Sequence, residues 1–176
     1  MSTEPVTDTE LRLAPPDIFK TAVISECGKY RYSLVREWDA DKPRMCWVML
    51  NPSTADASID DPTIRRCVSF AKRQWCGSIE VVNLFAYRSK DPKVLRDTEE
   101  FIGTGNDNYI SEAFARARIV VAAWGASKVS EHRGLDVLLN STRNLYYLGQ
   151  TKQGGPRHPL YVSSSQSILR YWTIAY

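Results

Sequence analysis

Short apolar runs alternate with helical patterns along most of the chain, and this rhythm constrains the fold more than any other feature. Four runs are predicted to be buried strands, at 46–50, 79–84, 118–124 and 145–148. Helical apolar spacing follows from Pro62 and recurs over 107–116 and 128–139. Because parallel strands need a crossover between them, the pattern predicts an α/β fold. We expect a three-layer α/β/α domain with a central four-stranded, mostly parallel sheet.

The two ends of the chain lie outside this rhythm. Residues 1–17 are predicted to be a flexible N-terminal arm, and 18–176 a single α/β domain. An N-terminal β-hairpin is expected over 21–38, with its turn near Gly28. The tail at 165–171 is expected to form a last helix.

The composition excludes several classes of protein. The net charge of +3 is compatible with a phosphate-bearing partner but is low for a dedicated duplex binder. The four cysteines include no C-x-x-C pair, so we expect free thiols and neither a zinc nor an iron–sulfur site. The first nine residues are polar, and no stretch approaches the roughly 20 apolar residues of a membrane span. We therefore expect a cytoplasmic protein without a membrane partner.

Polar residues and glycine follow the predicted strands where each strand ends. Asn51 follows the first strand, Asn83 lies at the end of the second, and Trp124-Gly125 ends the third. A loop after the fourth strand contains His158. Ligands of such sheets bind outside the carboxyl ends of the strands. Asn83 is the most informative of these residues, because a buried side-chain amide must be paired or must bind something.

Four short segments carry a resemblance to a known superfamily. They are Leu50-Asn51-Pro52-Ser53-Thr54, Val82-Asn83-Leu84-Phe85-Ala86-Tyr87-Arg88, Ala122-Ala123-Trp124-Gly125-Ala126 and Pro156-Arg157-His158-Pro159-Leu160. In order and approximate spacing they resemble the uracil-DNA glycosylase superfamily, over about residues 45–165. More closely, the chain resembles a bacterial and phage family, the domain of unknown function numbered sixteen forty-three. The resemblance implies a glycosylase-like core at 45–165, with the hairpin outside it.

The resemblance also implies roles for individual residues. Asn51 would position an attacking water, and Asn83 would read the edge of a base, since an amide offers both a donor and an acceptor. His158 would stabilise negative charge on a departing base. Phe85 or Tyr87 would supply a stacking face.

Six further residues lie in these motifs or beside them and are candidates for substrate binding. They are Pro52, Ser53, Trp124, Gly125, Lys152 and Arg157. Lys152 or Arg157 would act with His158 on a leaving base or a phosphate. A tryptophan such as Trp124 is more often a core residue than a stacking platform, and it is the following Gly125 that suggests the close approach of a ligand.

The chain departs from the glycosylase pattern at several positions. Leu50 stands where glycine is usual, and Leu160 follows His158-Pro159 where serine is usual. Asp56, Asp60 and Asp61 form an acidic stretch that would repel the phosphate backbone of a duplex. Asp61 is most simply the N-cap of the helix at Pro62. Asp56 or Asp60 is a candidate general base for water, or a metal ligand together with Asp61.

The leading hypothesis is a protein that recognises a nucleobase and hydrolyses an N-glycosidic bond. Its ligand would be a base, nucleoside, nucleotide or single-stranded nucleic acid, and the chemistry needs no metal and no redox cofactor. Two alternatives stay open. One is a non-catalytic nucleotide-binding protein that senses or sequesters its ligand. The other is a protein-interaction module that docks through the hairpin. The sequence does not determine the oligomeric state.

Overall fold

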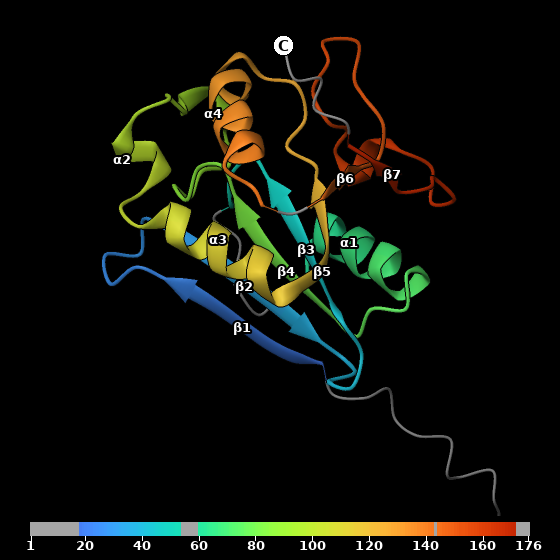
Figure 1. Cartoon of the computed structure of the whole chain (residues 1–176). Helices are drawn as coiled ribbons and strands as arrows, with labels where there is room; N and C mark the ends of the chain where they lie inside the picture. Colours follow the sequence, from blue (N-terminus) through green and yellow to red (C-terminus); the bar gives the residue numbers. More distant parts are fainter. Residues whose placement is uncertain (1–17, 54–59, 143, 172–176) are drawn as a thin grey trace, which may run out of the picture.

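The protein has an α/β fold built on one mixed sheet of seven strands (Figure 1). The computed structural model describes residues 18–53, 60–142 and 144–171. The strands are β1 (Phe19–Ile24), β2 (Arg31–Glu37), β3 (Arg44–Met49), β4 (Ser78–Asn83), β5 (Ala117–Ala122), β6 (Leu145–Tyr147) and β7 (Leu169–Arg170). The helices are α1 (Pro62–Arg73), α2 (Glu99–Ile102), α3 (Asn106–Arg116) and α4 (Lys128–Leu139), with 3-10 turns η1 (Pro92–Val94) and η2 (Pro159–Tyr161).

The strand order is β1-β2-β4-β3-β5-β6-β7. β4 and β5 pair in parallel with β3, and β6 pairs in parallel with β5. The outer strands β1, β2 and β7 add antiparallel pairs. The predicted α/β class is confirmed, but the expected four-stranded sheet is replaced by a mixed sheet of seven strands. The N-terminal hairpin is not an appendage, because β2 pairs directly with β4.

The tail differs from the sequence-based expectation. No helix forms over 165–171; this segment contains β7, which pairs with β6. The serine-rich sequence explains the difference, because serine side chains compete with the backbone for hydrogen bonds. Ser165 N–H donates to the hydroxyl of Ser163, and Tyr171 N–H donates to the carbonyl of Leu145.

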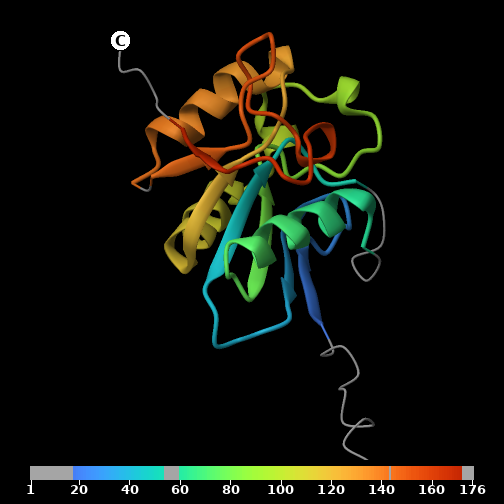
Figure 2. The ribbon, with the colours of Figure 1, turned by 90° about the vertical axis from the view of Figure 1, so that its right-hand side faces the viewer.

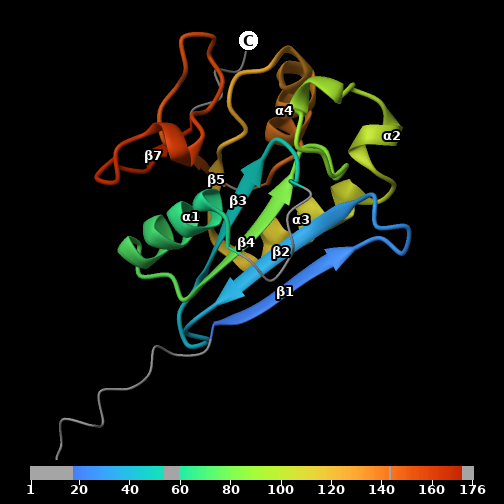
Figure 3. The ribbon, with the colours of Figure 1, turned by 180° about the vertical axis from the view of Figure 1, so that it is seen from behind.

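Helices cover both faces of the sheet. Side chains alternate along each strand, so neighbouring residues of β3 pack on opposite sides. Val48 packs in a cluster with Phe114 of α3, whereas Trp47 packs in another with Phe70 of α1. Figures 2 and 3 show α1 on the face opposite α3. No helix in the described part of the chain is long and apolar enough to span a membrane.

The carboxyl ends of the parallel strands meet at one edge of the sheet. Asn83 ends β4, Asn51 lies just beyond β3, and Trp124 lies just beyond β5. Because β2 runs antiparallel to β4, its first residue, Arg31, lies at the same edge. The backbone N–H of Arg31 donates to the carbonyl of Ala86, just past the end of β4. The fold thus brings four segments, distant in sequence, to one place.

Candidate functional site

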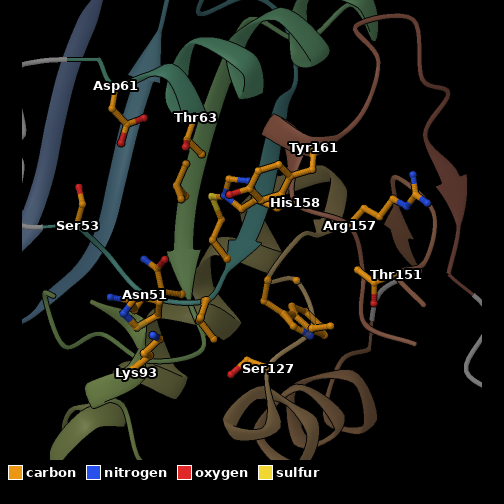
Figure 4. A pocket seen from close by; sticks show the side chains of 18 of the residues that line it. Asn51, Ser53, Asp61, Thr63, Lys93, Ser127, Thr151, Arg157, His158 and Tyr161 are labelled. Atoms are coloured by element: carbon orange, nitrogen blue, oxygen red, sulfur yellow. The ribbon is translucent and has the colours of Figure 1, made fainter. Parts of the chain in front are cut away.

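A pocket of about 810 Å³ lies at this edge of the sheet, beside the start of α1 (Figure 4). Eight of the residues predicted from the sequence line it: Asn51, Ser53, Asn83, Trp124, Gly125, Lys152, Arg157 and His158. Figure 4 shows Asn51 and Lys93 at one end of the pocket, and Thr151 and Arg157 at the other. The volume is in the range of sites for small molecules and cofactors.

The two aromatic residues predicted to stack on a base do not line this pocket. Phe85 is fully buried in the core on the α3 side of the sheet. Tyr87 packs against Phe101, at 5.0 Å between ring centroids, and against Tyr30, at 6.0 Å. Pro52 is buried and is not among the lining residues either. The aromatic residues that do line the pocket are Trp124 and Tyr161.

The acidic stretch is divided between structural and pocket positions. Asp60 accepts a hydrogen bond from Nε of Arg36 at 2.6 Å and lies 3.5 Å from Nζ of Lys20, so it anchors the hairpin instead of lining the pocket. Asp61 does line the pocket, and its Oδ1 caps α1 by accepting from Ile64 N–H at 2.8 Å. Asp56 lies outside the described residues. Within those residues, no cluster of three histidine, cysteine, aspartate or glutamate side chains could hold a metal ion.

Asn83 lines the pocket with an unused hydrogen-bond donor. The residue is 2% exposed, and its Nδ2 has no hydrogen-bond partner among the described residues. The backbone around it is held firmly, since Nδ2 of Asn106 donates to the carbonyls of Asn83 and Leu84. An unsatisfied buried amide costs about 1–3 kcal/mol, so a ligand acceptor would recover that free energy.

Asn51 is fixed with its acceptor unused. Its Nδ2 donates to the carbonyls of Pro52, at 3.1 Å, and Ser89, at 2.9 Å. Both of these bonds use the nitrogen, and Oδ1 accepts no hydrogen bond from the described residues. Asn51 therefore presents a carbonyl-type oxygen, which can hold a water molecule or a ligand donor.

His158 is positioned as a neutral hydrogen-bond donor. Its Nδ1 accepts from Leu160 N–H at 3.3 Å, which requires that the ring proton reside on Nε2. Burial lowers the pKa of His158 below its ordinary value of 6.5, and the carboxylate of Asp61 only partly opposes this. Arg66 of α1 fixes the segment after His158 by donating to the carbonyls of Pro159 and Val162.

Two glycines allow the wall formed by Trp124 and the His158 loop to assemble. A Cβ on Gly134 of α4 would lie 3.0 Å from three ring atoms of Trp124, so glycine lets the indole lie against the helix. A Cβ on Gly155 would lie 2.2 Å from the carbonyl oxygen of Gly125. Gly125 N–H donates to the carbonyl of Pro156, which joins the two loops.

Sequence reasoning missed two cationic lining residues, Arg31 and Lys93. Arg31 belongs to the hairpin, outside the strand–helix rhythm, and no sequence signal linked it to Asn83. Lys93 lies in η1, outside the four segments that carry the resemblance. That the start of β2 lies beside the end of β4 follows only from the antiparallel pairing of these two strands.

The comparisons with known proteins identify a family. No curated protein and no solved structure shows significant similarity to this chain. A family described as "Protein of unknown function (DUF1643)" matches residues 31–160, from the start of β2 into η2. The match includes both Arg31 and His158, and it covers all the lining residues of the pocket except Tyr161. The chain belongs to the DUF1643 family.

Proposed function

We propose that this pocket recognises a nucleobase and that the protein hydrolyses the N-glycosidic bond that attaches the base to its sugar. The unpartnered Nδ2 of Asn83 carries the proposal. A buried amide at the wall of a pocket recognises a carbonyl acceptor, and the edge of a nucleobase offers one beside a donor. The indole of Trp124, which also lines the pocket, supplies an apolar wall for a planar ring.

The other side chains suit hydrolysis. Asn51 would hold water through Oδ1, and the water oxygen would attack the anomeric carbon. The carbon–nitrogen bond breaks and its electron pair leaves with the base. Nε2–H of His158 would donate to the base carbonyl on which this charge develops. Asp61, the described acidic residue that lines the pocket, would accept the proton of the water.

The parallel strands support the same proposal. On this view β4, β3, β5 and β6 are the counterpart of a glycosylase-like sheet, with β1, β2 and β7 added at its edges. The ligand would be a base, nucleoside, nucleotide or single-stranded nucleic acid.

One observation favours the second candidate, a nucleotide-binding protein without turnover. Asp60, a predicted general base, is committed to Arg36 and is absent from the pocket lining. Catalysis would then depend on Asp61, whose Oδ1 already caps α1.

A ligand screen with base-release measurements tests the proposal. Bases, nucleosides, nucleoside monophosphates and short single strands are screened by thermal shift, and each hit is followed by chromatography for free base. A ligand present at about 100 times its Kd should stabilise the folded protein by about 2.7 kcal/mol. Binding with base release supports the glycosidase, and binding without release supports the second candidate. No stabilisation by any ligand would contradict both.

Two variants make the screen specific for the pocket. Asn83→Leu keeps the shape of the side chain and removes the unsatisfied amide, so it should fold at least as stably and bind no base. Asn108→Leu makes the same change at an exposed position of α3 and should leave binding unchanged. Equal binding by the two variants would show that Asn83 does not read the ligand.

A further inference from the structure

A β-bulge in the hairpin determines where Arg31 points. Val23 pairs with Ser33, but the next residue of β1, Ile24, pairs with Arg31, so β2 contains one extra residue, Tyr32. Such bulges re-aim side chains and are common beside functional sites.

The two faces of β2 reveal the effect of the bulge. The Ser33 hydroxyl donates to Glu80 at 2.9 Å, and Glu80 bonds to Arg116 of α3, so Ser33 faces the α3 layer. Strict alternation would put Arg31 on that same face. Instead Arg31 lines the pocket beside α1, and the ring of Tyr32 stacks on that of Tyr109 of α3, with 4.7 Å between the ring centroids.

Arg31 is a buried cation, and none of the described residues accepts a hydrogen bond from its guanidinium. The residue is 7% exposed, its Nε has no hydrogen-bond partner, and its side chain forms no ion pair with a described residue. Burial lowers the pKa of Arg31 to about 10, and the positive charge of Arg88 contributes to this decrease. The negative charge of Asp61 raises the pKa and so opposes both effects. The side chain therefore stays protonated at neutral pH.

The charge of the pocket lining favours an anion. Four cationic side chains, from Arg31, Lys93, Lys152 and Arg157, line the pocket, against the single carboxylate of Asp61 among the described residues. A planar guanidinium donates two parallel hydrogen bonds to a phosphate, and such charge-assisted bonds are the strong ones.

We propose that Arg31 forms a phosphate-binding subsite of this pocket, so that the ligand is a nucleoside phosphate and not a free base or nucleoside. The nucleoside part of this inference rests on the proposed function, whereas the phosphate part rests on Arg31 and the lining charges. The phosphate belongs either to a free nucleotide or to the backbone of a single strand. Both sources present the same oxygens to the guanidinium.

Calorimetric titration of the full chain tests the subsite. The probes are each nucleoside of the screen, its monophosphate, a short single strand containing it, and inorganic phosphate. The wild type should bind the monophosphate at least about tenfold more tightly than the nucleoside, as expected for hydrogen bonds to a charged group. Arg31→Met should remove this preference and leave nucleoside binding unchanged. Arg118→Met removes the same charge from an exposed position of β5, outside the pocket, and is the control.

The outcomes separate the two proposals. Equal binding of nucleoside and monophosphate, unaffected by Arg31→Met, would overturn the subsite and leave the proposed function standing. Inorganic phosphate that binds only when Arg31 is present, with no binding of any nucleoside, would support the subsite and overturn the proposed function. Tighter binding of the single strand than of the monophosphate, lost in Arg31→Met, would assign the subsite to a backbone phosphate.

Discussion

Replacing Arg31 by methionine should stabilise the protein in the absence of a ligand. The pKa of Arg31 falls well below the ordinary value of arginine, to about 10, chiefly because burial disfavours the charged form. Each pKa unit corresponds to about 1.36 kcal/mol, so keeping the guanidinium charged costs the folded state roughly 3 kcal/mol. Below pH 10 this cost is present in full, since folded and unfolded chains are both protonated. This cost is relieved only as the pH rises above about 10 toward the ordinary pKa of arginine. We therefore expect Arg31→Met to raise the free energy of unfolding at pH 7 by about 1–3 kcal/mol.

Arg36 provides the matched control. It is also a buried arginine of β2, at 0% exposure, but its Nε donates to Asp60 and its Nη1 to the carbonyl of Val35. Arg36→Met should lower the free energy of unfolding by about 2–3 kcal/mol, because among the described residues it leaves the Asp60 carboxylate with the longer contact to Lys20. Urea titrations followed by circular dichroism, in a buffer without phosphate, measure both variants. A loss in Arg31→Met as large as that in Arg36→Met would show that protein groups hold the guanidinium, and would refute the reasoning.

Three further predictions concern the opposite wall of the pocket. Ligand affinity should be constant from pH 8 to 6.5 and decrease at lower pH. Burial lowers the pKa of His158, and protonation of Nδ1 breaks the hydrogen bond from Leu160 N–H that orients the ring. Affinity measured across this pH range, for the wild type and for His158→Gln, checks the prediction. Gly134→Ala should push the indole of Trp124 toward the ligand and weaken ligand binding at least tenfold. The free energy of unfolding should change by less than about 1 kcal/mol, because alanine favours the helix. Unchanged affinity would contradict the close packing of Trp124 on α4. Gly155→Ala should cost about 1–3 kcal/mol in urea unfolding and abolish base release, since its Cβ overlaps the Gly125 carbonyl.

The parts of the fold that could be predicted from sequence are those set by local periodicity. The helix start at Pro62 was predicted correctly because Asp61 is both a good N-cap and adjacent to proline. Asn51, Asn83 and Trp124 could be assigned to one edge because parallel strands end on the same side of a sheet. The structure places all three in the lining of one pocket.

What could not be predicted depends on register and long-range pairing. To predict that Arg31 lines the pocket, one must know both that β2 pairs antiparallel with β4 and that β2 contains an extra residue at the bulge. Neither feature has a local sequence signature. Phe85 and Tyr87 were predicted to lie in the site because they belong to the motif around Asn83. Beyond β4, however, both side chains pack into the cluster on the α3 side of the sheet. Asp60 was predicted to be a general base only because it is an acidic residue near Asn51. Its ion-pair partner, Arg36, is distant in sequence, so the pairing could not be predicted.

The wide sequence separation of the pocket walls affects when the site can form during synthesis. Arg31, Asn51 and Asn83 leave the ribosome well before Trp124 and His158, at a synthesis rate of about 5–20 residues per second. A nascent chain that ends before His158 lacks the Arg66 contacts that fix η2, which join residues separated by 93 and 96 positions. Binding energy can therefore act only after the wall around His158 has docked, so a ligand should rescue unstable finished chains but not their early folding intermediates.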